Sequence, residues 1–203
     1  MLVIGLTGGI GTGKTEVCRI VRELGATLIN ADQVGHEAYT PHTEAWTEVV
    51  AAFGDGILTE KGEIDRRKLG AMVFADASQL ERLNRIMHPR MAEIVRQKLR
   101  ALDDAGAPVA VVEAAVLFEA GWDSLVDEVW TTESPEDSVV ARLQERNGFA
   151  PEEIRKRIAS QMPTEERAGR ADEVINNSGD LKGLENAVRD IWKRKVEGRI
   201  EQT

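Results

Sequence analysis

Short apolar runs alternate with amphipathic stretches from the start of the chain. Residues 2–6 are almost continuously apolar and end in glycines, a pattern that favours a buried parallel strand. Across residues 14–24 the apolar positions recur at helical spacing, and Gly25 follows as a stop signal. A second apolar run at 26–29 completes a strand–helix–strand unit, whose crossover is right-handed in almost all proteins.

Residues 32–106 show helical spacing with several breaks, and Pro89 predicts a kink or a boundary in the later part. Downstream, the pattern predicts strands at 109–112, 128–132 and 173–175, and helices from Ser134, over about 151–162 and from about 181 onward. This alternation predicts an α/β fold with a parallel sheet.

The clearest helix start follows the strand at 128–132. Ser134 is expected to cap the helix, with Pro135 in the first turn and acidic residues near the positive end of the dipole. Asn147-Gly148 is expected to close the same helix.

Residues Gly8–Thr15 match G-x-x-x-x-G-K-[ST] in full, directly after a strand and at the opening of a helix. Glycines let backbone N–H groups turn toward phosphate oxygens at a positive helix end. Lys14 can reach the β- and γ-phosphates, and the Thr15 hydroxyl can join the Mg²⁺ shell. The complete motif and its flanks disfavour a glycine-rich turn that binds nothing. We therefore expect ATP and Mg²⁺ as cofactors, with nucleotide contacts from Gly9, Gly11, Thr12, Gly13, Lys14 and Thr15.

The loop alone does not distinguish a kinase from a GTPase or a motor ATPase. The guanine-reading motif N-K-x-D is absent, which lowers the GTPase interpretation. Glu113, at the end of the third strand, would suit a carboxylate that holds the metal's water shell. An ordinary strand-end acid explains it equally well.

Asp32 follows the second strand, at the sheet edge where open α/β folds bind ligands. A carboxylate there can accept the proton of an attacking hydroxyl or orient that hydroxyl for in-line transfer. Aspartate is also a good helix N-cap. Position alone leaves both interpretations open.

Arg142 and Arg146 lie one helical turn apart and project from one helix face. Arginines on a mobile helical hairpin can close over a transferring phosphoryl group. A solvated basic face is the competing interpretation, and it is the better one for residues 155–157.

Composition narrows the class further. The 203 residues fit one domain, and the net charge of −9 argues against broad binding to nucleic acid or anionic membranes. No apolar run approaches the roughly 20 residues of a membrane span, and no signal peptide is recognisable, so a cytoplasmic location is expected. Cys18, the one cysteine, is expected to be a buried small side chain. Nothing in the sequence predicts the oligomeric state.

Several short motifs spread over nearly the whole chain resemble one family. Two of them are especially specific: the Thr-Gly-Gly-Ile-Gly opening at 7–11 and the Arg-Ile-Ala-Ser-Gln-Met run at 157–162. On these motifs the chain resembles the dephospho-coenzyme A kinases. The other matching segments are 31–32, 53–54, 57–58, 88–89, 117–119, 146–148 and 171–177.

The resemblance implies ATP-dependent phosphorylation of the ribose 3′-hydroxyl of dephospho-coenzyme A. It implies a P-loop NTPase fold of the nucleoside-kinase type with a five-stranded parallel sheet. Within the single domain 1–203, a helical substrate-binding insertion would cover about 32–106 and a helical lid about 142–165. By position, the expected catalytic residues are Lys14, Asp32 and Arg142, and Arg146 and Asn177 join the nucleotide contacts.

Three positions depart from the family pattern. Glu113 stands where aspartate is common, His36 where arginine is common, and Asn147 where aspartate is common. Two rival functions remain open: another P-loop metabolite kinase acting on a nucleoside or sugar acid, and a non-catalytic nucleotide-binding switch. Asp32 and the paired arginines weaken the switch, because a pure binding module needs neither.

Overall fold

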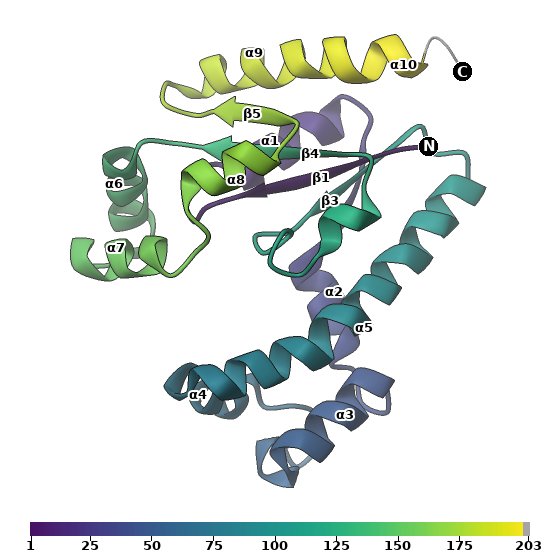
Figure 1. Cartoon of the computed structure of the whole chain (residues 1–203), viewed down its shortest axis with the longest axis vertical. Coiled ribbons are helices and arrows are strands. Elements are labelled where there is room, and N and C mark those ends of the chain that lie inside the picture. Colours follow the sequence, from purple (N-terminus) through teal and green to yellow (C-terminus); the bar gives the residue numbers. More distant parts are fainter. Residues whose placement is uncertain (201–203) are drawn as a thin grey trace. The chain divides into compact units, whose positions relative to one another are not determined.

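The computed structural model describes residues 1–200, and the chain divides into two compact units. The first unit contains residues 1–29 and 101 onward, and the second contains residues 30–100. Each unit is described by itself (Figure 1).

The first unit is built on a five-stranded sheet of order β2-β3-β1-β4-β5. Its central strand β1 runs parallel to β3 on one side and to β4 on the other, and β4 runs parallel to β5. The predicted parallel sheet is therefore confirmed, with each strand within two residues of its expected bounds. The strands are β1 (Leu2–Gly8), β2 (Thr27–Asn30), β3 (Val109–Glu113), β4 (Glu128–Glu133) and β5 (Glu173–Asn176).

The main core lies between this sheet and two helices, α1 (Lys14–Glu23) and α9 (Leu181–Trp192). Ile4 and Leu6 of β1 are buried against α1 residues such as Ile20 and α9 residues such as Val188. The burial of the apolar faces of both helices against the sheet fixes the position of β1. Because β1 leads directly into the glycine-rich loop, the start of the loop is held as well.

A second cluster joins α6 (Glu136–Asn147) to α7 (Pro151–Ala159). Leu143 and Ile154 are fully buried in it, and Ile10 of the glycine-rich loop packs against the same cluster. Hydrophobic contact thus links this helical hairpin to the loop.

The start of α6 differs from the prediction. The Ser134 hydroxyl donates to the backbone oxygen of Asn177 at 2.7 Å, and Pro135 occupies the cap position without any side-chain cap. The predicted serine cap is wrong because this hydroxyl ties the end of β4 to the end of β5. Gly148 ends α6 with φ of 68°, as expected.

Beyond α7, the sequence predicted one helix up to about residue 162. The structure ends α7 at Ala159 and forms a further helix, α8 (Thr164–Arg170), which the pattern missed. The chain then leaves α9 through a π-helical turn, Lys193–Glu197, into α10 (Gly198–Ile200).

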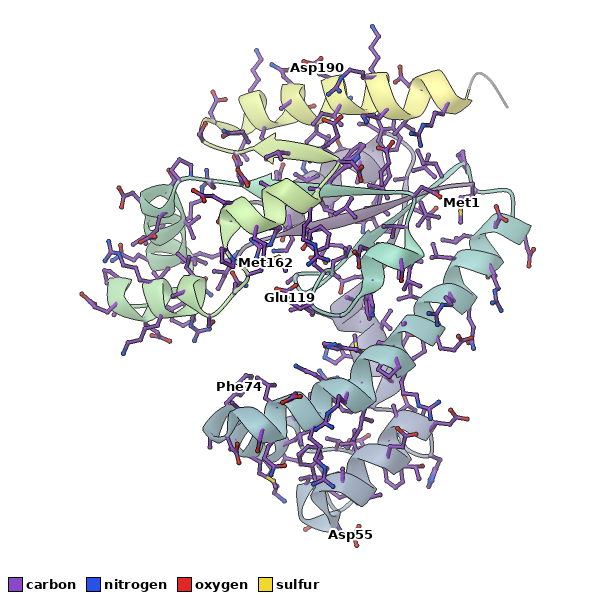
Figure 2. All side chains as sticks on the ribbon, viewed as in Figure 1. Met1, Asp55, Phe74, Glu119, Met162 and Asp190 are labelled. Atoms are coloured by element: carbon purple, nitrogen blue, oxygen red, sulfur yellow. The ribbon has the colours of Figure 1, made fainter. Side chains whose placement is uncertain are left out.

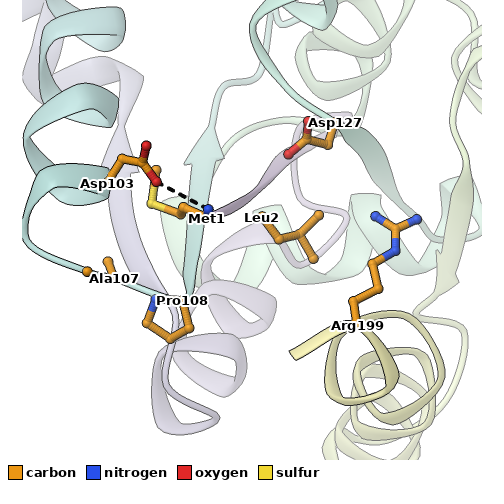
Figure 3. Close-up of a pocket in the computed structure, with 8 residues that line it drawn as sticks. Met1, Leu2, Asp103, Ala107, Pro108, Asp127 and Arg199 are labelled. Atoms are coloured by element: carbon orange, nitrogen blue, oxygen red, sulfur yellow. Dashed lines mark ion pairs between the residues drawn. The ribbon is translucent and has the colours of Figure 1, made fainter. Parts of the chain in front are cut away.

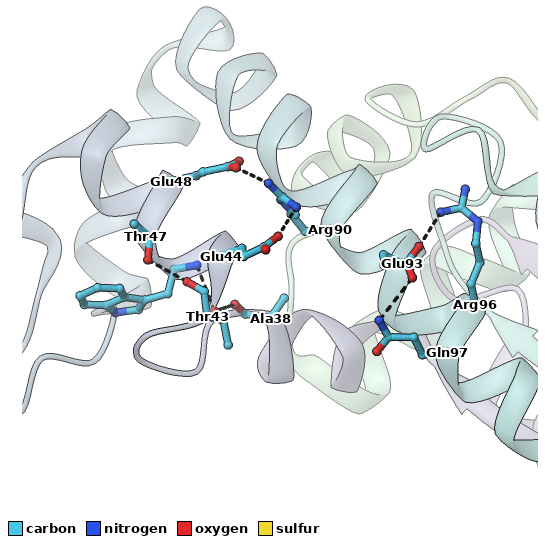
Figure 4. A network of polar contacts seen from close by, with 10 residues as sticks. Ala38, Thr43, Glu44, Thr47, Glu48, Arg90, Glu93, Arg96 and Gln97 are labelled. Atoms are coloured by element: carbon cyan, nitrogen blue, oxygen red, sulfur yellow. Dashed lines mark hydrogen bonds and ion pairs between the residues drawn. The ribbon is translucent and has the colours of Figure 1, made fainter.

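The second unit is helical. Its core is formed by buried side chains from four helices, among them Val49, Leu69 and Leu83. On its surface, Arg90 of α5 pairs with both Glu44 and Glu48 of α3 (Figure 4). The helices are α2 (Ala31–Ala38), α3 (Glu44–Phe53), α4 (Arg66–Ala75) and α5 (Ala77–Asp104), with a 3₁₀ turn at Asp55–Ile57.

Helix α5 runs without a break through Pro89, so of the two predicted outcomes, a kink or a boundary, the boundary is wrong. Proline removes one backbone donor, which costs roughly 3 kcal/mol in a helix interior. Buried residues lie on both sides of it, with Met87 before and Val95 after. This continuous apolar stripe favours one helix over two.

Cys18 lies in α1 and packs against the main core, where it is partly rather than fully buried. Burial, and secondly the charge of Glu113, raise the pKa of its thiol to about 12. Because the thiolate is the reactive form, we expect a thiol reagent at pH 8 to label the native protein far more slowly than the urea-unfolded chain.

The same shift predicts a pH dependence of stability. The unfolded thiol ionises near pH ~8.5, whereas the native thiol stays protonated. Stability is therefore present below that pH and is lost as pH rises toward the native pKa. In urea titrations from pH 7 to 10, the free energy of unfolding of wild type should fall relative to that of Cys18→Ala. Equal labelling of the native and unfolded protein by the thiol reagent would contradict the burial of Cys18, on which both predictions depend.

Candidate active site

The glycine-rich loop joins the end of β1 to the start of α1, as the motif predicts. Three of its glycines, Gly8, Gly11 and Gly13, have positive φ of 147°, 72° and 110°. At Gly13 a Cβ would also lie 2.4 Å from Nδ2 of Asn177. Backbone conformation and the lack of space therefore both require glycine here.

Thr12 holds the loop to the sheet. Its hydroxyl donates to the backbone oxygen of Gly9 at 2.8 Å and shares a hydrogen bond of 2.6 Å with the hydroxyl of Thr132 on β4. Thr12 is 8% exposed. Its side chain thus fixes the loop, and the neighbouring backbone N–H groups are held ready for a ligand.

Lys14 and Thr15 begin α1, at the positive end of the helix dipole. The Lys14 ammonium donates to the backbone oxygens of Gly8 at 2.7 Å and Gly9 at 3.1 Å. The Thr15 side chain is exposed. The Lys14 ammonium therefore reaches back to the start of the loop, whereas Thr15 lies at its helix end.

Two predicted residues from distant parts of the sequence meet at this loop. Asn177, after β5, donates from Nδ2 to the backbone oxygen of Thr12 at 2.9 Å. Arg142, on α6, donates to the backbone oxygen of Asn177 at 2.9 Å and to the Ser134 hydroxyl at 2.9 Å. A longer contact of 3.5 Å joins Arg142 to the backbone oxygen of Gly11.

The other arginines of the expected lid lie on its surface. Arg146 is exposed and donates to the side chain of the adjacent Asn147 at 2.8 Å. Arg155 pairs with Glu136 at 3.1 Å, and Arg157 stacks over a phenylalanine ring. Arg155 and Arg157 thus have the exposed environment that was predicted for residues 155–157.

Sequence reasoning missed two residues at the loop. Gln161 accepts a hydrogen bond of 2.8 Å from the backbone N–H of Ile10. Arg167 on α8 is 3% exposed, and its NH1 lies 3.6 Å from the point where a Cβ on Gly9 would stand. Gln161 lay within a family-specific motif, whereas nothing marked Arg167 among the basic residues of a polar helix.

Asp32 lies in the second unit, where it is exposed in the first turn of α2. The cap of that helix is Asn30, whose side-chain oxygen accepts from the backbone N–H of Gln33 at 3.0 Å. The N-cap interpretation of Asp32 is therefore wrong, because the neighbouring asparagine already fills that role.

Cavities in the first unit lie at opposite ends of the sheet strands. A small one of about 90 Å³ adjoins the loop and is lined by Gly9, Thr12 and Arg167, among others. A larger one of about 520 Å³ lies at the amino ends of β1 and β3, near Met1, Pro108 and Asp127 (Figure 3). Because open α/β sheets bind ligands at the carboxyl ends of their strands, the small cavity marks the candidate site.

Glu113 ends β3, in register with Leu6 of β1. Among residues 1–200, no group of three or more His, Cys, Asp or Glu side chains is arranged to hold a metal ion. In the same part of the chain, no helix combines the length and apolarity needed to cross a bilayer.

A phosphate loop of this geometry, between the first strand and first helix of a five-stranded parallel sheet, defines a P-loop kinase fold. A family model described as dephospho-CoA kinase matches residues 2–183. The chain belongs to the dephospho-CoA kinase family.

Individual relatives agree with this membership. The chain is 45% identical over 195 residues to a dephospho-CoA kinase of Geobacter sulfurreducens, covering 96% of this chain and 99% of the relative. A crystal structure from Thermus thermophilus superposes with a TM-score of 0.79 at 30% identity, covering 96% and 97% of the two chains. A dephospho-CoA kinase from Campylobacter jejuni, at 24% identity and a TM-score of 0.73, covers 97% and 98% and shares the fold.

Proposed function

We propose that this protein transfers the γ-phosphoryl group of ATP to the ribose 3′-hydroxyl of dephospho-coenzyme A, releasing coenzyme A and ADP. The observation that carries the proposal is the complete phosphate loop, with the Lys14 ammonium 2.7 Å from the Gly8 carbonyl, in a chain that matches this kinase family over residues 2–183. We place the reaction in the cytoplasm.

The loop residues divide the work on ATP. Backbone N–H groups of Gly11, Gly13 and their neighbours hold the phosphates at the start of α1. Lys14 leaves its two carbonyl partners to bind the β- and γ-phosphates, and Arg142 adds positive charge beside Gly11. Asn177 keeps the loop in shape through Thr12.

The residues present fit Mg²⁺ only as part of a nucleotide complex. The exposed Thr15 hydroxyl at the start of α1 supplies one oxygen, and Mg²⁺ usually takes its other ligands from substrate phosphates and water. When bound, Mg²⁺ neutralises charge on the β- and γ-phosphates. Glu113 is the carboxylate best placed in sequence to hold its water shell.

On the acceptor side, we assign Asp32 as the general base. It is exposed, and Asn30 relieves it of any capping role. A carboxylate can accept the proton of the attacking 3′-hydroxyl as the new phosphate bond forms. In this scheme the predicted insertion of about 32–106, most of which lies in the unit of residues 30–100, binds dephospho-coenzyme A. The helical segment of about 142–165 serves as the lid.

The deciding experiment measures ADP release from Mg-ATP with and without dephospho-coenzyme A. The proposal expects steady turnover only with this acceptor. Nucleosides and sugar acids in the same assay test the rival metabolite kinases. Tight ATP binding without acceptor-dependent ADP release would instead identify a nucleotide switch and overturn the proposal.

The contacts of the lid arginines predict unequal roles. Arg142→Ala is expected to reduce turnover by on the order of 10³-fold, as loss of a phosphate-clamping arginine can. Arg155→Ala is expected to stay near wild type, because its partner is the exposed Glu136. The measurement is kcat for both variants under saturating ATP. Equal losses in the two variants would contradict this assignment of the lid residues.

A further inference from the structure

Arg167 is a charged side chain buried beside the phosphate loop with most of its hydrogen-bonding capacity unused. Arg167 is 3% exposed, and its NH2 group donates to the backbone oxygen of Met162 at 2.9 Å. Its Nε is buried and has no hydrogen-bond partner. Among residues 1–200, Arg167 forms no ion pair with a carboxylate.

Such an arrangement is costly in the absence of a ligand. A buried charge without hydrogen-bonded partners loses its hydration and gains little in return. Burial accordingly lowers the pKa of the Arg167 guanidinium, although the carboxylates of Glu119, Glu133 and Glu166 act in the opposite direction. A guanidinium offers five donors in a planar fork that matches phosphate oxygens. An anion in the adjoining cavity would satisfy it.

The Arg167 guanidinium lies at the Gly8–Gly9 end of the phosphate loop. NH1 lies near Gly9, and the Lys14 ammonium contacts the backbone oxygens of Gly8 and Gly9 at the same end. Arg142 instead contacts Gly11. Since the lysine of this loop reaches the β- and γ-phosphates while the helix end holds the α- and β-phosphates, Arg167 lies at the γ end.

The segment between α7 and α8 fixes this position from two successive residues. Gln161 accepts from the backbone N–H of Ile10, and Met162, labelled in Figure 2, accepts from Arg167. The first bond joins the base of the expected lid to the phosphate loop, and the second holds the Arg167 side chain to that same segment. The small cavity of about 90 Å³ opens between these groups and is lined by Gly9, Gln161 and Arg167.

We propose that Arg167 is a further catalytic residue, whose guanidinium binds the γ-phosphoryl group of ATP and stabilises the charge that develops on it during transfer. This inference rests on the proposed kinase function and adds a residue to it. Arg167 thus complements Lys14 at the γ end of the loop, while Arg142 acts beside Gly11. A purely structural Arg167 would instead only hold α8 to Met162.

The test compares ATP with ADP, which lacks the γ-phosphate. For Arg167→Met, a variant of similar length without charge, we expect the Kd for ATP to rise about tenfold to a hundredfold, the worth of a charge-assisted hydrogen bond. The Kd for ADP should stay within about threefold of wild type, well below that range. Arg167→Lys should recover part of the preference for ATP. The matched control is Arg170→Met on the same helix, because Arg170 pairs with Asp123 on the surface.

Melting temperature without ligand separates this role from a structural one. Removing a poorly partnered buried charge should leave the melting temperature of Arg167→Met unchanged or higher. A structural arginine predicts a lower melting temperature and equal changes for ATP and ADP. That pair of results would overturn the proposal, as would an unchanged affinity for ATP.

The binding comparison needs no acceptor, so it judges Arg167 separately from the proposed reaction. Acceptor-dependent ADP release by wild type tests the reaction itself. If wild type turns over dephospho-coenzyme A and Arg167→Met keeps its preference for ATP, the role of Arg167 is wrong and the function stands. With acceptor present, kcat of Arg167→Met should fall by on the order of 10²–10³-fold or more.

Discussion

Replacing Lys14 with alanine is expected to reduce turnover by on the order of 10³-fold or more, close to the detection limit, while the fold stays intact. The Lys14 ammonium contacts two backbone oxygens of the loop, and Lys14 is not a member of the main hydrophobic core. In the proposed mechanism its charge binds the β- and γ-phosphates of ATP. The measurement is kcat and kcat/KM from ADP release at saturating dephospho-coenzyme A.

Lys193→Ala supplies a matched control, because Lys193 is an exposed lysine after α9. This variant should retain the activity of wild type. Melting temperatures should agree among the three proteins, so that any loss of activity reflects the site. Near-normal turnover by Lys14→Ala would contradict the assignment of the phosphate loop.

The parts that could be predicted from sequence are those set by local patterns. The strands have apolar runs whose length and spacing leave little freedom, and the central strand β1 is buried through Ile4 and Leu6. The phosphate loop is a contiguous motif whose glycines adopt the positive φ that other residues resist, as at Gly11 and Gly13. Local backbone preference and global topology agree in this region.

The missed features depend on contacts between residues far apart in sequence. Ser134 would cap a helix in isolation, but its hydroxyl bonds to Asn177, 43 residues later. Pro89 would end a helix in isolation, but α5 is buried on both sides of it. Local propensity describes correctly what each residue does in an isolated segment. In the folded protein, tertiary contacts give the residue a different role.

Arg167 shows the same limit for the site. Its sequence neighbours are mainly polar, so periodicity gives α8 no apolar stripe and gives the arginine no special mark. The burial of Arg167 depends on the position of α8 beside the phosphate loop, which the sequence of α8 does not predict. Helical spacing singled out Arg142 together with Arg146, and the family pattern raised its weight and added Asn177. Spacing alone does not show that residues 35 positions apart meet at one loop.

The second unit carries exposed apolar side chains that the acceptor role would explain. Phe74 projects from α4 and is 82% exposed (Figure 2), and Met72 of the same helix is 43% exposed. In the proposed function this unit binds dephospho-coenzyme A, whose adenine ring and pantetheine arm both offer apolar surface. The same unit carries the residue on which acceptor chemistry is proposed to depend, Asp32.

Asp32→Asn is expected to lower turnover by about 10²–10⁴-fold, the usual worth of a positioned general base. Asparagine keeps the size and much of the hydrogen bonding of aspartate but loses its negative charge and most of its basicity. The affinity for ATP should change little, because Asp32 lies outside the phosphate loop and is exposed at the start of α2. The measurement therefore pairs kcat with the Kd for ATP on one variant.

Asp65→Asn is the matched control, because Asp65 does cap a helix in the same unit: its carboxylate accepts from the backbone N–H groups of Arg67 and Lys68 at 3.0 and 3.2 Å. Asparagine caps nearly as well, so this variant should keep both its stability and its turnover. Since Asn30 caps α2, Asp32→Asn should also keep its stability, and a loss of turnover would reflect lost basicity. Turnover near that of Asp65→Asn would leave Asp32 as an ordinary first-turn residue and would require the proton acceptor to be another group.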